Sequence, residues 1–367
     1  MIIIEDNAKP SGSSDHPATI GDSTETNTDP TETNTDPTDL PKNNGASNTP
    51  LARGHLAQKH HYPSINRTPN HNTRIQIESQ TTSLAVEAAV SIIINGIHYA
   101  VLMASPHQLE YLAVGFLFSE GLIEYSHELL DWDVTQLADI ESYQKFAQDA
   151  SDESLDSAAI EQSLQQFQDY DIYVVELVLS QRCHQRIQAQ KRQLAGRTGC
   201  GMCGITGLAQ ALPDLSNYSQ GDLQHEDTQQ ASIDDSKATV PSLDYLLALR
   251  QQVDATQHTH QLTGAVHAAA TIHNQQLYLF EDVGRHNALD KLIGWQLRQK
   301  IDVDCVLMTS RLSIELVQKS IRSRIPWLIG MSAPTSTAVR VAERYGLGLA
   351  GFLRDNRVTY YTSYADL

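Results

Sequence analysis

The chain has 367 residues, of which 40% are apolar and 19% charged, and its formal charge is −18. This length can supply a sizeable hydrophobic core. No apolar run approaches the roughly 18 residues that a membrane-spanning helix needs, which excludes an integral membrane protein. Four cysteines are too few for a disulfide scaffold, and the basic residues cluster too weakly to favour nucleic acid as a ligand.

The acidic charge is concentrated in three stretches. Residues 1–49, 126–170 and 213–240 together contain 26 acidic and 4 basic residues, whereas the rest of the chain contains 18 acidic and 22 basic residues. The remaining sequence is therefore mildly basic. The acidity of the whole chain does not argue against a ligand that carries phosphate.

Residues 1–72 are predicted to form a disordered, low-complexity arm. They are rich in Thr, Asn, Asp, Ser and Pro, and the heptapeptide TETNTDP occurs twice in tandem. Such a composition cannot bury enough apolar surface to offset chain entropy, so the arm is expected to be dispensable. The opening MIIIEDNAKP is too short for a signal peptide, and a reducing cytoplasm is the expected location.

The first folded region, residues 73–125, is predicted to be a hairpin followed by a helix. Asn95-Gly96 separates two apolar runs, which is the strongest short-range signal of a β-hairpin. Ser105 and Gln108 have the spacing of a capping box, so we expect a helix to begin just after Ser105. Apolar residues at helical spacing then run to Gly121, which can end this helix.

The rest of the chain is predicted to be an α/β core interrupted by surface insertions. Acidic insertions are expected at 126–170 and 213–240, and the core at 171–363. Predicted strands at 171–180, 277–283, 303–310, 327–332, 347–353 and 357–362 alternate with predicted helices at 286–300, 313–324 and 335–346. Short apolar strands that alternate with amphipathic helices predict a mostly parallel sheet covered by helices.

In such a sheet, three polar loops should meet at the edge where the strands end, which is where ligands collect. The loops are 281–286, 309–313 and 332–336. They supply Arg285, Arg311, several hydroxyls and helix-start N–H groups, which suit a phosphate or pyrophosphate. The alternative is structural: Asp282, Ser313 and Thr335 cap helices, and the arginines pair with nearby acids.

The sharpest chemical signal is the loop RTGCGMCG, which contains Cys200 and Cys203. Two thiols at this spacing can form a disulfide, hold half of a metal site or present one nucleophilic thiolate. A zinc site would need further ligands, for which Cys183 and His184 are candidates. The glycines leave the sulfurs unshielded, and five preceding cations lower the pKa of a thiol. A reactive thiol is therefore favoured, and no metal site is predicted.

Other candidate residues have structural explanations. Cys305 lies within a predicted strand and is expected to be a buried core thiol. His267 and His286 flank the predicted edge, and both are expected to be structural rather than catalytic.

Several long motifs resemble, in the same order, the formate dehydrogenase accessory sulfurtransferase family. They are RTGCGMCG, TGAVHAAA at 263–270, EDVGRHNALDKLIG at 281–294, SRLSIELVQKS at 310–320, SAPTSTAVRVAE at 332–343 and GFLRDNR at 351–357. Residues 95–123 resemble the amino-terminal region of the same family. The first 72 residues and the two acidic insertions depart from the family pattern.

This resemblance implies a sulfur carrier. The protein would accept sulfur as a persulfide on Cys200, with Cys203 as its neighbour, from a cysteine desulfurase. It would transfer that sulfur to the Mo-bis(molybdopterin guanine dinucleotide) cofactor, which formate dehydrogenase requires for activity. The family's cofactor-binding segment corresponds to Phe352, Leu353, Arg354, Asp355, Asn356 and Arg357. The resemblance further implies a cytidine-deaminase-like fold and a homodimer. This sequence lacks the deaminase zinc signature, and its composition predicts neither nucleic acid nor a membrane as partner.

Two other functions remain open from the residues themselves. The protein could be a non-catalytic chaperone that holds the molybdenum cofactor while another protein supplies sulfur. It could also be a redox protein that forms a reversible disulfide between Cys200 and Cys203. The sulfur carrier requires Cys200 for formate dehydrogenase activity, whereas the chaperone does not.

Overall fold

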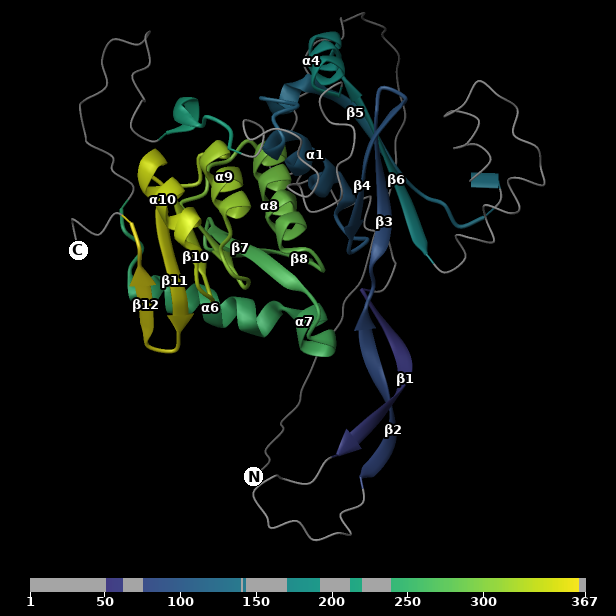
Figure 1. The fold of residues 1–367 in the computed structure, drawn as a ribbon, viewed down its shortest axis with the longest axis vertical. Helices are drawn as coiled ribbons and strands as arrows, with labels where there is room; N and C mark the ends of the chain where they lie inside the picture. The colour runs from purple at the N-terminus through teal and green to yellow at the C-terminus, as the bar shows by residue number, and fades with distance from the viewer. Residues whose placement is uncertain are drawn as a thin grey trace, which may run out of the picture. The chain divides into compact units, whose positions relative to one another are not determined.

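The computed structural model describes residues 51–61, 75–139, 141–142, 170–191, 212–219 and 239–362. All of them belong to one compact unit, Gly45–Leu367. They form three β-sheets and the helices that pack on them (Figure 1). None of the described helices is both long and apolar enough to cross a membrane.

The largest described sheet has six strands in the order β12-β11-β10-β9-β7-β8. The strands are β7 His267–His273, β8 Gln276–Asp282, β9 Cys305–Met308, β10 Trp327–Gly330, β11 Gly348–Arg354 and β12 Arg357–Tyr360. Among them, β9 pairs with β10 and β10 with β11 in parallel, and the other three pairings are antiparallel. The α/β class is confirmed, but the prediction of a mostly parallel sheet is wrong.

The antiparallel part arises from a strand that the sequence analysis did not identify. β7 turns directly back into β8 through Asn274 and Gln275, which both have positive φ angles. A two-residue turn joins antiparallel strands without a crossover helix. Because Gln is uncommon at such a position, the turn was not recognisable from the sequence.

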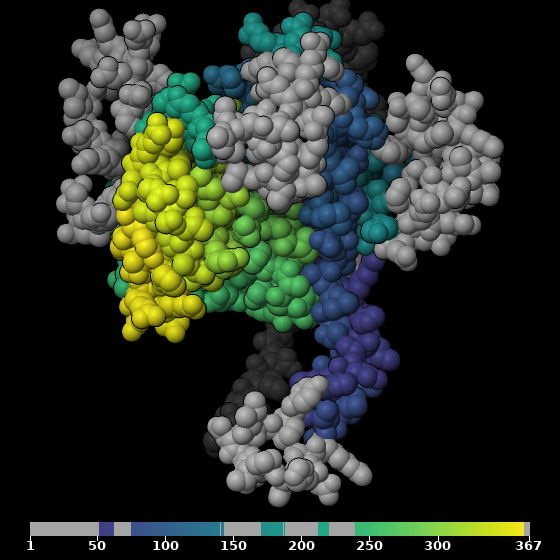
Figure 2. Space-filling view, in the orientation of Figure 1, coloured from purple at the N-terminus to yellow at the C-terminus, as the bar shows by residue number. Residues whose placement is uncertain are grey.

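Helices cover both faces of this sheet. The helices α8 Arg285–Gln299, α9 Ile314–Arg322 and α10 Ser336–Tyr345 lie on one face, and α6 Leu243–Thr256 lies on the other. Val306 and Leu328 belong to the hydrophobic core on the side of α8–α10, whereas Cys305 and Trp327 pack with α6. In the space-filling view the carboxyl-terminal elements, coloured green to yellow, form one continuous surface (Figure 2).

A second sheet has four strands in the order β4-β3-β6-β5. They are β3 Ala88–Ile94, β4 Ile97–Ala104, β5 Leu129–Gln136 and β6 Asp171–Leu179. The predicted hairpin at Asn95-Gly96 is confirmed, with φ angles of 49° and 76°. A short 3-10 helix, η1 Ser126–Glu128, precedes β5, and the helix α4 Gln181–Lys191 follows β6.

Two predicted boundaries are wrong in this region. β5 lies within the expected acidic insertion 126–170, and β6 pairs in the four-stranded sheet rather than in the core expected at 171–363. Along β5 the acids Asp131 and Asp133 alternate with apolar side chains. The acidic residues of β5 are typical of a surface insertion, whereas the alternation of polar and apolar side chains every second residue is typical of a strand.

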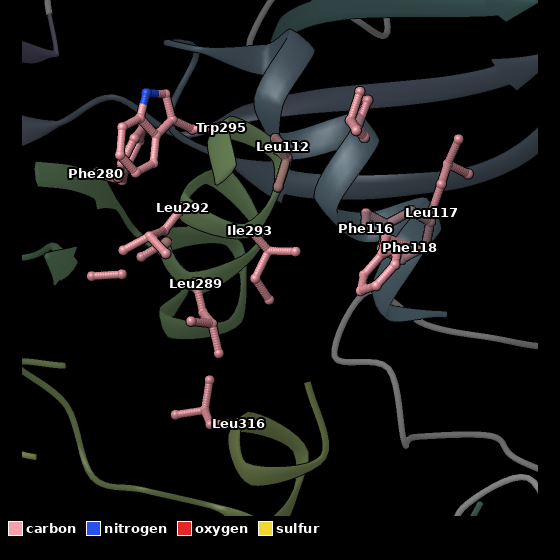
Figure 3. Packing of buried hydrophobic residues seen from close by; sticks show 14 of the residues in the cluster. Leu112, Phe116, Leu117, Phe118, Phe280, Leu289, Leu292, Ile293, Trp295 and Leu316 are labelled. Atoms are coloured by element: carbon pink, nitrogen blue, oxygen red, sulfur yellow. The ribbon is translucent and has the colours of Figure 1, made fainter. Parts of the chain in front are cut away.

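The helix α1, Leu109–Ser119, packs closely on α8. A Cβ atom on Gly115 would lie 1.8 Å from the carbonyl oxygen of Asp290, and one on Gly294 would lie 1.9 Å from that of Tyr111. Apolar side chains of both helices surround this contact (Figure 3). Helix α8 is consequently buried between α1 and the six-stranded sheet.

The predicted helix cap at Ser105 is wrong, because α1 begins at Leu109. The Ser105 amide donates to the Asp282 carboxylate (3.0 Å), and the Ser105 hydroxyl accepts from the amide of Val283 (3.1 Å). These long-range bonds satisfy Ser105 in place of a local cap. Ser105 therefore joins the end of β4 to the loop between β8 and α8.

A two-stranded sheet precedes these elements in the chain. β1 Ala52–His61 and β2 Gln76–Ala85 pair antiparallel over all ten residues of each strand. The prediction of a disordered arm through residue 72 is thus wrong for 52–61, whereas 1–50 and 62–72 lie outside the described residues. β1 contains no β-branched residue, so its pairing with β2, rather than its own propensity, makes it a strand.

The predicted insertion at 213–240 is described only at its two ends. Its beginning packs against the body: Leu215 is buried, and the Tyr345 hydroxyl donates to Asp214 (3.4 Å). A short 3-10 helix, η2 Ser216–Tyr218, follows. Leu215 therefore belongs to the hydrophobic core, whereas Asp214, Ser216 and Asn217 are exposed, as expected of a surface insertion.

Removal of residues 1–50 is expected to leave the protease resistance of the folded body unchanged. Removal of residues 1–72 also deletes β1 and leaves β2 unpaired, and an unpaired strand exposes its backbone. Limited proteolysis should therefore cut the shorter protein within 76–85 well before full-length protein is cut there. Equal resistance of both truncated proteins would contradict a structural role for β1.

Candidate functional site

Four strands of the six-stranded sheet end at one edge. β9, β10 and β11 are parallel, and β8 runs in the same direction because β7 is antiparallel to both β8 and β9. The polar edge, as we call it, consists of the segments that follow these strands: 282–286, 309–315, 331–336 and 352–357. Helices α8, α9 and α10 also begin here. The predicted meeting of three polar loops at one edge is confirmed.

Backbone hydrogen bonds hold the segments of the polar edge together. The Leu312 amide donates to the carbonyl of Ala333 (3.1 Å), and the Thr335 amide donates back to the carbonyl of Leu312 (2.9 Å). The Phe352 amide donates to the carbonyl of Ser332 (3.2 Å). The ends of β9, β10 and β11 are therefore fixed relative to one another before any ligand binds.

Asp282 is buried and forms an ion pair with Lys291 at 2.7 Å; both side chains are completely inaccessible to solvent. The Asp282 carboxylate also accepts hydrogen bonds from the amides of Ser105 and Gly284 and from the side chain of Asn287. The Lys291 ammonium donates to the carbonyl of Ser105 (3.2 Å). These contacts join β4, the end of β8 and the start of α8. Because its carboxylate is fully occupied and buried, Asp282 is not available to a ligand.

Substitution of Lys291 by Met is expected to destabilise the protein by about 3–5 kcal/mol, because it leaves a buried carboxylate without its counter-ion. Urea denaturation measures this loss. The matched control is Arg53→Gln, which breaks the Arg53–Asp171 pair of similar length (2.8 Å) at an exposed site. That change should cost less than about 1 kcal/mol. Similar losses for the two variants would contradict the role given to the buried pair.

Among the described residues, three buried polar atoms at the starts of α8 and α9 have no hydrogen-bond partner. They are Arg285 Nε, His286 Nε2 and Glu315 Oε2. Ser313 occupies the N-cap position of α9 without capping it, whereas the Thr335 hydroxyl does cap α10 by accepting from the amide of Ala338 (3.3 Å). The structural alternative of the sequence analysis therefore holds for Thr335 and fails for Ser313. Buried polar atoms without partners indicate a place where a ligand can bind.

The electrostatics of this cluster leave it with both signs of charge. Burial and the nearby charges of Lys319 and Arg285 lower the pKa of His286 to about 4, so its ring is neutral at pH 7. Burial raises the pKa of Glu315, but the Ser313 hydroxyl, the backbone amide of Glu315 and the nearby charge of Arg285 outweigh it, and the net shift is downward. The cluster thus combines a carboxylate, a neutral imidazole and the Arg285 guanidinium.

The basic side chains near this cluster differ in whether they already form an ion pair. Lys319 donates to both carboxylate oxygens of Asp290, at 2.7 and 2.8 Å, and is occupied. Burial lowers the pKa of His267, as does the nearby charge of Arg285. Within the described part of the chain, neither Arg285 nor Arg311 forms an ion pair. The predicted alternative, in which both arginines pair with acids, is not seen among these residues.

The predicted cofactor-binding segment lies at the same edge. It spans the end of β11, a turn at Asp355-Asn356 and the start of β12. All of its residues are exposed except Leu353, whose side chain is buried in the core beside α6 and is not available to a ligand. Arg354 and Arg357 are direct cross-strand partners, and neither pairs with a described acid.

Cys200 and Cys203 lie outside the described residues. Of the other two cysteines, Cys183 is buried on α4, and Cys305 is buried on β9, where burial raises its pKa to about 12. The prediction of a core thiol at Cys305 is confirmed. Among the described residues, no group of three or more His, Cys, Asp or Glu side chains could hold a metal ion.

The model of the FdhD/NarQ family matches residues 85–367. The chain belongs to this family. A "Sulfur carrier protein FdhD" from Shewanella oneidensis is 33% identical over 290 residues, which cover 78% of this chain and 87% of the relative. A protein of the same name from Chromobacterium violaceum is 37% identical over 285 residues, covering 76% and 88%.

The fold matches that of a solved structure. A protein from Desulfotalea psychrophila, assigned as a formate dehydrogenase accessory protein, superimposes with a TM-score of 0.52 at 16% identity. The match covers 86% of this chain and 99% of that one. The family match over residues 85–367 includes β3 to β12, the RTGCGMCG loop and the segment 352–357, but not β1.

Two residues that shape the candidate site, Lys291 and Glu315, were not singled out from the sequence. Lys291 lies in a helix whose other residues at 287–296 are mostly apolar, and a helix that is apolar on all sides is buried. Glu315 was part of a family motif without a role of its own. Ser105 was considered only as a helix cap, and this local signal concealed its long-range contact.

Proposed function

We propose that this FdhD/NarQ protein is a sulfur carrier for formate dehydrogenase. It accepts sulfur from a cysteine desulfurase as a persulfide on Cys200 and transfers it to the Mo-bis(molybdopterin guanine dinucleotide) cofactor, which binds as a substrate. The observation that carries the proposal is the match over residues 85–367, which brings Cys200 and the unpaired arginines of the polar edge into one family of named sulfur carriers.

The loading step requires one reactive thiolate. The Cys200 thiolate attacks the outer sulfur of the desulfurase persulfide, so that one S–S bond forms as another breaks and the desulfurase cysteine leaves as a thiolate. This exchange needs no oxidant or reductant. The glycines beside Cys200 and Cys203 and the basic residues before them favour such a thiolate.

The polar edge has the chemistry that a guanine dinucleotide needs. Arg354 and Arg357 are cross-strand partners beside a turn, and neither pairs with an acid in the described part of the chain. Like charges at this spacing repel each other unless an anion lies between them. A diphosphate accepts charge-assisted hydrogen bonds from both guanidiniums. The buried unpaired atoms of Arg285, His286 and Glu315 supply further donors and acceptors at the same edge.

Partners and location follow from this chemistry. A thiol that exchanges sulfur must stay reduced, which supports a cytoplasmic location and cytoplasmic partners, a cysteine desulfurase and formate dehydrogenase. The family resemblance supports a homodimer, which light scattering of the purified protein tests. It also supports a cytidine-deaminase-like fold, in agreement with helices on both faces of the six-stranded sheet.

The function is tested in a bacterial strain that lacks its own FdhD protein. Expression of this chain is expected to restore formate dehydrogenase activity, measured as formate-dependent dye reduction in cell extract. The strain's dehydrogenase should be present in equal amounts with and without the chain. Activity that stays at background although the chain is expressed and folded would contradict the proposal.

A further inference from the structure

β11 leaves its regular pairing at the polar edge. The register between β11 and β12 shifts between Gly351 and Arg354, and Phe352 within this interval has a φ of 52°. The Phe352 amide donates to the carbonyl of Ser332 (3.2 Å) rather than to β12. A bulge of this kind redirects the side chains that follow it, and a positive φ on Phe persists only where neighbours hold it.

Arg250 on α6 holds the other side of this bulge. Its Nη1 atom donates to the carbonyl of Leu353 (3.1 Å) and lies 3.4 Å from Oδ1 of Asp355 in the turn. Its Nε atom donates to Asp254, one turn further along α6 (3.3 Å). The Arg250 side chain is only 20% exposed, although Asp355 is 97% exposed. The half-buried Arg250 guanidinium thus binds the Leu353 carbonyl and also contacts the exposed carboxylate of the turn.

The contact with Asp355 determines which charges of the segment are free. Asp355 is the one acid between Phe352 and Arg357, and it is the nearest potential partner in sequence for both Arg354 and Arg357. Arg250 contacts it from the α6 side, and neither arginine pairs with it. Among the described residues the two guanidiniums therefore have no counter-ion, as an anion-binding clamp requires.

We propose that Arg250 is a positioning residue for the nucleotide-binding segment. It binds Asp355 and holds the Leu353 carbonyl, so that Asp355 does not neutralise Arg354 and Arg357. This inference rests on the proposed function, in which the segment binds the guanine nucleotide part of the cofactor. Arg250 itself does not touch the nucleotide.

The test compares GDP affinities by calorimetry with the full-length protein. Arg250→Gln is expected to weaken GDP binding about tenfold, because Asp355 is released to neutralise the arginine pair. Asp355→Asn alone is the reference for this comparison, because Asp355 itself belongs to the segment. The double variant, Arg250→Gln with Asp355→Asn, should recover most of the lost affinity, which a merely structural role of Arg250 would not produce. Arg53→Gln, which breaks an Arg–Asp pair on β1 and β6, is the matched control and should have no effect.

Each outcome decides the inference. Wild-type affinity in Arg250→Gln overturns the role of Arg250 and leaves the proposed function standing, whereas no GDP binding by the wild type counts against the nucleotide part of the proposed function itself. A loss that Asp355→Asn does not relieve also overturns the inference, since Arg250 would then act only on folding. If Arg250→Gln melts too low to be titrated, Arg250→Lys takes its place. A lysine cannot hold Leu353, Asp355 and Asp254 at once, so a smaller loss, again relieved by Asp355→Asn, is expected.

Discussion

Replacement of Cys200 by alanine is expected to reduce formate dehydrogenase activity to the background of a strain without the protein. The alanine variant has no thiolate at the position that receives sulfur, and a persulfide cannot form on a methyl group. Calorimetric titration with GDP should show unchanged affinity, because the nucleotide is proposed to bind at 352–357 on the polar edge. Retained GDP binding is also the control for correct folding.

This result separates the carrier from the chaperone. A chaperone that only holds the cofactor while another protein supplies sulfur would keep its activity without Cys200. Full activity of Cys200→Ala would therefore contradict sulfur transfer through this residue and favour the chaperone.

Replacement of Arg357 by alanine is expected to weaken GDP binding by about 10- to 150-fold. A charge-assisted hydrogen bond to a phosphate contributes roughly 1.5–3 kcal/mol, and 1.4 kcal/mol corresponds to a factor of ten. Arg357 is exposed, so the difference between the variant and the wild type should shrink at high salt. Sulfur loading on Cys200 should be unaffected, because it requires only the thiol and the desulfurase.

The control for this titration is Arg53→Ala, which removes one exposed arginine from β1. It corrects for the general effect of lost positive charge on the binding of an anion. Equal GDP affinities of Arg357→Ala and the wild type would contradict nucleotide binding at the turn.

The elements that the sequence predicts well are those with local signals. The Asn95-Gly96 hairpin has its turn residues in the sequence, and the alternation from β8 to β12 follows from apolar strands and amphipathic helices, with ends correct to within a few residues. β1 was missed because its side chains are mostly polar, and β5 because its acidic residues resemble a surface insertion. Both are largely exposed and are strands through their pairing with β2 and β6. The antiparallel direction of β7 could not be predicted, because the turn that joins it to β8, Asn274-Gln275, lacks the glycine that usually marks such turns.

The candidate site shows the same division between local and long-range information. The meeting of three loops at one edge could be predicted, because it follows from strand direction in an α/β sheet. The contacts that shape the edge could not, since they join distant parts of the chain. Ser105 meets Asp282 across 177 residues, and Arg250 meets Leu353 across 103. Which polar atoms are left free for a ligand depends on such contacts.

The most direct test of the sulfur-carrier function is the intact mass of the protein after incubation with a cysteine desulfurase and cysteine. We expect a mass increase of one sulfur atom that dithiothreitol removes and that is absent in Cys200→Ala. The same increase should appear in Arg357→Ala, whose thiol is untouched. No added sulfur on the wild type, or the same added sulfur on Cys200→Ala, would contradict a persulfide carried by Cys200.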